Sequence, residues 1–256
     1  MKIKALVLSI LMMIISFDLW AQLAKGDFMA GSVVGQTFET LAFGSSSEGP
    51  VCEKWISYWM DPPSKNAIPP IAGEPLSWTG YGERGNSIVL GSGFPNDVKG
   101  RRGISHVFTR PVSSGVLYLS FVIKPELIAN RKYWPQVGFC TNMKGSGPHC
   151  CVCFFPQSGD GLTYNIGVRL VGALMIVDTI YSVGQKHLIV MKYNLDKRNV
   201  SVFVDPDLAK PEPLPDETVH YGVTAEKACG ITVRDVSDVA GLVGNFRVAR
   251  AWEDIR

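Results

Sequence analysis

The sequence lacks the features that identify several protein classes. It has 25 basic and 23 acidic residues, so its charge does not indicate binding to nucleic acid or to an anionic membrane surface. It also lacks a long helical pattern of apolar residues and any internal repeat. Only one apolar run, at the amino terminus, has the length of a targeting segment. Helical bundles, repeat proteins and polytopic membrane proteins are therefore disfavoured.

The first residues predict a signal peptide over 1–21. Two lysines precede an apolar run at 5–17, which is short for a membrane span, and Ala21 suits cleavage. A retained anchor helix is the alternative, which Asp18 and Trp20 at the end of the run disfavour. We therefore expect an exported protein that is periplasmic, at the outer surface or secreted.

The mature chain, 22–256, then has 23 basic and 22 acidic residues and no second apolar run long enough to cross a bilayer. A chain of this length can bury a sizeable core, and all-β sandwiches of this size are commonly one domain. The sequence therefore predicts one domain over 22–256, without a transmembrane segment.

Catalytic patterns are also missing. Glycoside hydrolases need a pair of carboxylates, but no E-x-D is present, and no G-x-S-x-G marks a serine hydrolase. The glycine-rich stretches at 80–85 and 91–103 lack the strand-to-helix setting of phosphate loops. The sequence thus favours a protein without catalysis. A hydrolase whose carboxylates come from distant parts of the chain is the alternative.

What is present is a period of two. Apolar or alternating runs typical of strands lie at 116–123, 164–171, 187–193, 199–204, 231–236 and 242–250. Clusters of Gly, Ser, Asn, Asp and Pro separate them and suit turns. Many short strands with regular turns predict an all-β fold, an antiparallel two-sheet sandwich.

The amino-terminal third reads differently, because Gly, Ser and Pro are frequent at 44–50 and 61–75. Prolines exclude these stretches from central strands and helix interiors, so we expect surface loops. Between them, residues 52–60 fit one short helix with Trp55, Tyr58 and Trp59 on one face.

The stretch 192–213, KYNLDKRNVSVFVDPDLAKPEP, predicts the second half of a hairpin followed by a proline-rich exit. Pro206 has no amide hydrogen and so ends the strand. On this interpretation Asp205, Asp207 and Glu212 are solvated turn acids. The alternative is that Asp205 and Asp207 act as oxygen ligands for calcium. No other cofactor is expected.

The runs LIVMKYN, VSVFVDPD and EPLP, followed by ITVRD and VGNFRVARAWEDI, resemble the carboxyl-terminal half of a concanavalin A-like lectin/glucanase domain, in the version found in exported bacterial proteins. Asp205 stands where Asn is common in that family, and Asn245 where Asp is common. The resemblance implies a LamG-like jelly roll of two antiparallel sheets. It does not imply one activity, because this fold carries lectins, hydrolases and adhesion modules.

Four of the six cysteines lie within 138–155. KGSGPH suits a hairpin turn, and a register symmetric about it places Cys140 opposite Cys153, within disulfide range. We therefore predict a Cys140–Cys153 bridge or close thiol pair. The alternatives are free buried thiols or a zinc site, although Cys150, Cys151 and Cys153 lack the usual zinc spacing.

Aromatic side chains offer stacking platforms for sugars. Tyr133 and Trp134 follow a polar stretch and are the strongest candidates, and Trp55 and Trp59 are further ones. Trp252 is expected to pack the carboxyl-terminal segment against the sandwich. The sequence thus favours a domain that binds glycan or a cell-surface component, with a structural or adhesion module lacking a small ligand as another alternative.

Overall fold

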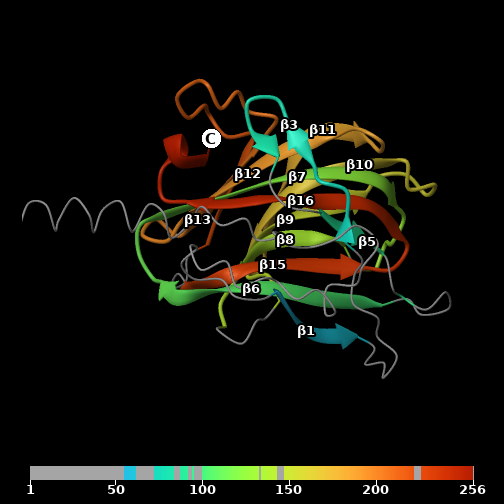
Figure 1. Ribbon diagram of the computed structural model, residues 1–256, viewed down its shortest axis with the longest axis horizontal. Helices are drawn as coiled ribbons and strands as arrows, with labels where there is room; N and C mark the ends of the chain where they lie inside the picture. Colours follow the sequence, from blue (N-terminus) through green and yellow to red (C-terminus); the bar gives the residue numbers. More distant parts are fainter. Residues whose placement is uncertain are drawn as a thin grey trace, which may run out of the picture.

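A computed structural model describes residues 55–61, 72–83, 87–91, 94, 100–132, 134–142, 147–221 and 226–255. The first sheet has the order β1 (Trp55–Asp61), β6 (Arg101–Val112), β15 (Ala228–Val236), β8 (Gln136–Cys140), β9 (Cys150–Pro156), β10 (Thr163–Leu170), β11 (Ala173–Ser182). The second has the order β14 (Glu217–His220), β13 (Asn199–Val204), β12 (His187–Asn194), β7 (Val116–Ile128), β16 (Val239–Ala249), β5 (Ser87–Leu90), β2 (Ala72–Gly73). A hairpin of β3 (Ser77–Trp78) and β4 (Gly82–Glu83) and a 3-10 helix, η1 (Trp252–Ile255), complete the described elements (Figure 1).

The predicted fold class is confirmed: among the described residues, two seven-stranded antiparallel sheets form a jelly-roll sandwich. All six predicted strand runs fall on β7, β10, β12, β13, β15 and β16. The predicted hairpin is β12–β13, in which Asn194 faces Asn199 across the turn. No helix among the described residues is long and apolar enough to span a membrane.

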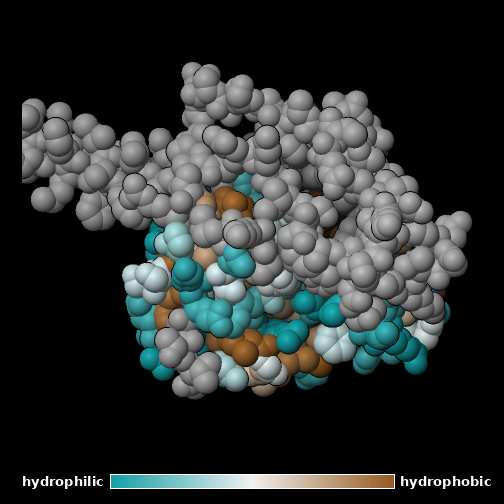
Figure 2. All heavy atoms as spheres, turned by 90° about the horizontal axis from the view of Figure 1, so that it is seen from below, coloured by the Kyte–Doolittle hydropathy of each residue, from teal (hydrophilic) through white to brown (hydrophobic). Residues whose placement is uncertain are grey.

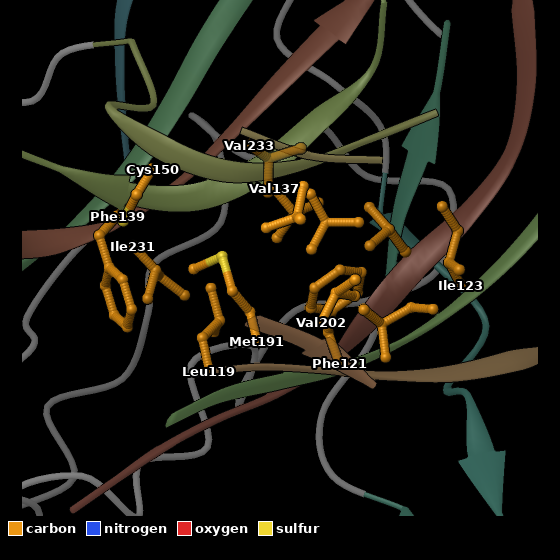
Figure 3. Packing of buried hydrophobic residues seen from close by; sticks show 14 of the residues in the cluster. Leu119, Phe121, Ile123, Val137, Phe139, Cys150, Met191, Val202, Ile231 and Val233 are labelled. Carbon is orange, nitrogen blue, oxygen red and sulfur yellow. The ribbon is translucent and has the colours of Figure 1, made fainter. Parts of the chain in front are cut away.

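The core lies between the sheets because alternate residues of each strand point inward. On β10 the inward residues are Tyr164, Ile166, Val168 and Leu170, all buried, as the alternation predicted. Figure 3 shows the same arrangement on other strands, with Phe121 and Met191 of the second sheet facing Val233 and Phe139 of the first. One apolar interior therefore joins the two layers.

The prediction of a helix over 52–60 is wrong, because 55–61 forms β1. Its backbone pairs with β6, with Trp55 opposite His106 and Trp59 opposite Gly103. Pairing with the neighbouring strand β6 satisfies backbone groups that a helix would satisfy internally, and aromatic and β-branched residues suit strands. The side chains of Trp55 and Trp59 lie outside the description.

The predicted Cys140–Cys153 pairing is also wrong. In the β8–β9 ladder Cys153 faces Gln136, and Cys150 faces Phe139. The two registers differ by an even number of residues, so every side chain keeps its face and the pattern alone does not choose between them. Four described cysteines are buried free thiols, Cys150, Cys151, Cys153 and Cys229, and Cys140 is also buried.

The chain itself covers the outer face of the second sheet. Tyr118, Leu188 and Phe203 point to this face and pack against Leu208, Trp252 and other residues of the β3–β4 hairpin, the 205–216 loop and η1. Trp252 is 3% exposed, and its ring packs edgewise on Phe203 at 5.2 Å between centroids. The structural role expected for Trp252 is confirmed.

Candidate functional site

The outer face of the first sheet differs, because small and polar residues occupy its centre. Two rows of facing residues cross β15, β8, β9 and β10 there: Arg234, Gln136, Cys153 and Gly167, then Thr232, Gly138, Cys151 and Arg169. We call these eight residues the polar face. They alternate with the inward residues of the same strands, and none of them is Asp or Glu.

An aromatic pair borders the polar face. Trp134 is half-buried and packs edgewise on Phe155, with 4.4 Å between ring centroids. Phe155 and both thiols, Cys151 and Cys153, form one outward-facing apolar cluster with Trp134 and Leu174. A Cβ added to Gly167 would lie 2.7 Å from Cε2 of Phe155, so glycine at this position leaves room for that ring against β10.

Two polar side chains of β10 flank that glycine. Asn165 faces Phe155 across the ladder and donates a hydrogen bond from Nδ2 to the Thr179 carbonyl at 3.0 Å. Arg169 donates from Nε to the Val171 carbonyl at 2.7 Å, and that bond orients its guanidinium. Both residues are half-buried, so part of each side chain still reaches solvent. Alternation in 164–171 already placed Asn165, Gly167 and Arg169 together on one face.

Gln136 lies at the centre of the polar face and is 1% exposed. Its Oε1 atom has no hydrogen-bond partner among the described residues. An unsatisfied buried acceptor carries a desolvation cost of about 1–3 kcal/mol. Nearby, Ser105 Oγ donates a hydrogen bond to Thr232 Oγ1 at 2.9 Å, so that polar pair on the same sheet is satisfied where the Gln136 oxygen is not. Sequence reasoning missed Gln136, because a single glutamine at the start of a strand carries no pattern.

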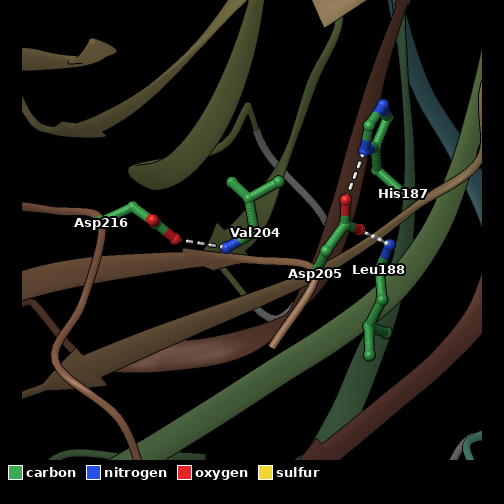
Figure 4. Close-up of polar contacts among 5 residues, drawn as sticks. All are labelled: His187, Leu188, Val204, Asp205 and Asp216. Atoms are coloured by element: carbon green, nitrogen blue, oxygen red, sulfur yellow. Dashed lines mark hydrogen bonds and ion pairs between the residues drawn. The ribbon is translucent and has the colours of Figure 1, made fainter. Parts of the chain in front are cut away.

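The second polar cluster lies at the end of β13, where Asp205 has a positive φ of 53°. Its carboxylate accepts hydrogen bonds from His187 Nδ1 at 2.7 Å and from the Leu188 amide at 2.9 Å (Figure 4). Asp216 accepts from the Val204 amide at 2.6 Å, one residue before Asp205 (Figure 4). These bonds fasten the start of the 205–216 loop to β12, so Asp205 is a structural acid.

Tyr164 and Tyr181 complete this cluster from the first sheet. The Tyr181 ring lies 5.1 Å from that of His187, and Tyr164 lies 6.5 Å from it. Burial, and then the charge of Asp205, raises the pKa of Tyr164 well above its ordinary value. Tyr164 Oη and His187 Nε2 are buried without a hydrogen-bond partner among the described residues.

The prediction that the three turn acids are simply solvated holds only for Asp207. Asp207 is exposed, caps the Ala209 amide and pairs with Lys210 at 3.1 Å. Glu212 instead accepts hydrogen bonds from Tyr118 Oη and Lys192 Nζ, both at 2.6 Å. These bonds hold the proline-rich loop on the second sheet.

The structure does not arrange Asp205 and Asp207, the calcium-ligand candidates, as a shared metal site. Asp205 and Asp207 each bond to separate protein donors. Within the described ranges, no group of three or more His, Cys, Asp or Glu side chains is arranged to hold a metal ion. The calcium and zinc interpretations therefore gain no support from this part of the chain.

Of the predicted aromatic platforms, Trp134 is the one whose side chain is described. Tyr133 lies outside the described residues, as do the predicted signal peptide at 1–21 and Cys52. Viewed from below, the described surface is mostly hydrophilic, with separate hydrophobic patches between the polar groups (Figure 2). To the predicted Trp134 the structure adds Asn165 and Arg169, which lie on the same outer face of the first sheet.

Similarity to known proteins is found among solved structures. No protein-family model matches, and no curated protein is similar in sequence. Among solved structures, the VIP36 exoplasmic/lumenal domain in its Ca2+/Man2-bound form has a TM-score of 0.47 and 9% identity over 89% of each chain. The Emp47p carbohydrate recognition domain has a TM-score of 0.45 and 10% identity, over 89% of this chain and 97% of that one.

A sialidase is similar with a TM-score of 0.43 and 11% identity over 64% of this chain, and this chain spans 15% of its length. At such low identity and TM-scores these structures carry no argument about ligands. The fold assignment rests on the pairing of the chain's own strands.

Proposed function

We propose that this protein is an exported, non-catalytic domain that binds a glycan or a glycan-bearing cell-surface component on the outer face of its first sheet. The observation that carries the proposal is half-buried Trp134, which packs on Phe155, on the face of the sheet where β10 presents Asn165 opposite Phe155 and Arg169 four residues further along. Sugar rings present C–H groups that stack on indole, and their hydroxyls pair with amide and guanidinium groups.

The two outer faces support this location. Packed elements of the chain already occupy the face of the second sheet. The aromatic pair and the polar face leave side-chain donors and acceptors at the border of the first sheet, next to the unpaired Gln136 oxygen. Binding sites of this kind combine an apolar surface with a few placed polar groups.

A glycan array with the full chain tests the proposal, followed by calorimetric titration of the strongest ligand. Trp134→Ala is expected to weaken binding at least about tenfold, or ~1.4 kcal/mol, while Leu214→Ala, at a residue 92% exposed in the 205–216 loop over the second sheet, leaves it unchanged. No binding by the unaltered chain to any glycan would contradict the function. Binding that Trp134→Ala leaves intact would contradict the site.

Two further measurements separate the alternatives. Release of reducing sugar from a polysaccharide panel would favour a hydrolase with a carboxylate pair assembled from distant residues. Binding to whole cells that persists after glycan removal would favour an adhesion module. We expect EDTA to leave glycan binding unchanged, because Asp205 and Asp207 are engaged with protein donors.

A further inference from the structure

Cys151 and Cys153 form a thiol pair on the outer face of the first sheet. Their Sγ atoms lie 3.6 Å apart, and both side chains are fully buried. The residues are two apart on β9, so they point to the same face, whereas Cys150 points into the core. The contact is therefore a consequence of the strand itself and not of a loop.

The neighbouring strands fit around the pair. Gly138 faces Cys151 on β8, and a Cβ added to Gly138 would lie 2.6 Å from Cys151 Cβ. The Cys150 carbonyl oxygen would lie nearer still, so a larger residue there would push the β9 backbone away from β8. On β10, Gly167 faces Cys153. Glycine thus adjoins each thiol on one side, and the aromatic pair of Trp134 and Phe155 packs beside them.

We propose that Cys151 and Cys153 are a reversible redox pair, which exchanges with small disulfides to form an intrastrand disulfide and is reopened by dithiols. The proposal is independent of glycan binding.

The native geometry favours a bond that forms but is easily reduced. In a strand, residues i and i+2 have Cα atoms about 6.4–6.8 Å apart, which is the upper end of the range that disulfides span. A bond closed at that separation carries strain, and strained disulfides are the labile ones. The pair therefore suits a redox-responsive site better than a permanent staple.

A small disulfide is the oxidant in this exchange and accepts the two electrons that the protein thiols lose. One protein thiolate attacks a donor sulfur, forms a mixed disulfide and releases one donor thiol. The second protein thiolate then attacks the protein sulfur of that mixed disulfide and releases the second donor thiol. The protein loses two electrons and two protons, and the donor disulfide is reduced to two thiols.

The surroundings set the conditions of the reaction. Burial and the hydrogen bond with Cys151 raise the pKa of Cys153, while Arg169 and Arg234 act in the opposite direction. Because the thiolate is the reacting form, exchange in the native protein is expected to be faster at alkaline pH.

To test the proposal, the full chain is incubated with oxidised glutathione at alkaline pH. It is then denatured and alkylated, and the free thiols are counted by mass spectrometry. The unaltered chain and Cys150→Ser are expected to lose two thiols each, and dithiothreitol should restore both. Cys151→Ser and Cys153→Ala each keep one thiol of the pair, so they should form no intrachain disulfide and lose at most that one thiol, as a glutathione mixed disulfide that the mass reveals. Circular dichroism of each variant identifies any that fails to fold, and the two substitutions at different positions serve as replicates.

An unchanged thiol count in the unaltered chain would overturn the proposal, as would an equal loss in Cys151→Ser. Refolding the denatured, reduced chain in a glutathione redox mixture extends the test to thiols that burial protects. The proposal predicts a bond between Cys151 and Cys153 there too, so a refolded chain that carries only other pairings also overturns it.

Discussion

The two outer faces of this sandwich are built on opposite principles. On the second sheet, outward residues such as Tyr118, Leu188 and Phe203 are apolar, and the chain packs its own loops and carboxyl-terminal helix over them. On the first sheet, the outward rows contain glycines, a thiol pair, Thr232, Gln136 and two arginines. The covered outer face of the second sheet therefore contributes to the stability of the fold. The outer face of the first sheet keeps hydrogen-bonding side chains, which are the groups that the proposed ligand would contact.

Substitution of Trp252, on the covered face, and of Trp134, beside the polar face, tests this comparison. The larger loss in the free energy of unfolding is expected at Trp252. Trp252→Ala removes a ring packed on Tyr118 and Phe203 and a hydrogen bond from Nε1 to the Lys210 carbonyl. We expect a loss of about 3 kcal/mol in the free energy of unfolding, measured by urea denaturation. An unchanged midpoint would show that the covered face contributes little.

Substitution of Asp205, which anchors the 205–216 loop to β12, should cause the next largest loss in the free energy of unfolding. Asp205→Ala removes the acceptor for His187 and for the Leu188 amide, and we expect a loss of about 2 kcal/mol on urea denaturation. Asp205→Asn is the matched control, since it tolerates the positive φ and keeps an acceptor for Leu188. Equal losses in the two variants would assign the effect to charge alone.

Alkaline pH should lower the free energy of unfolding through Tyr164, the buried tyrosine near His187 and Asp205. The pKa of Tyr164 is raised in the folded state, so its contribution is fully present below the ordinary tyrosine value of about 10 and is lost as pH rises above it. Each pH unit in that window should cost about 1.4 kcal/mol through Tyr164. Unfolding curves at several pH values check this, and Tyr164→Phe should flatten the slope. A slope identical in that variant would contradict the assignment.

The smallest effect on stability is expected at the other tryptophan. Trp134 is half-buried and borders the polar face, so Trp134→Ala should cost about 1 kcal/mol or less on urea denaturation, against the larger loss of Trp252→Ala. Its expected consequence is loss of glycan binding. A stability loss equal to that of Trp252→Ala would erase the distinction between the two faces.

Much of the fold could be predicted because the required signal is local. Alternation in 164–171 identified the inward residues of β10, and Asn and Asp at the 194–199 turn identified the β12–β13 hairpin. The helix predicted for 52–60 failed for the opposite reason. Its aromatic spacing fits a helix face, but pairing with β6 decided the conformation.

The candidate site was predictable only in part. Trp134 was selected for its polar flanking residues, and Asn165 and Arg169 were visible as outward positions of one strand. Their grouping with Trp134 depends on Phe155, which β9 brings beside β10. The partner of Asp205 lies on another strand of the hairpin, so Asp205 looked like a solvated acid until His187 was placed beside it.

By itself, the sequence determined that this protein is a two-layer β-sandwich and which residues of its strands point inward, because a period of two depends only on neighbouring residues. Only the tertiary structure decided the register of β8 on β9, the contact between Cys151 and Cys153 in its setting of glycines, and the choice of which outer face to cover. Those features depend on strand pairs and loops far apart in the chain, and a shift of two residues preserves the pattern while changing every partner.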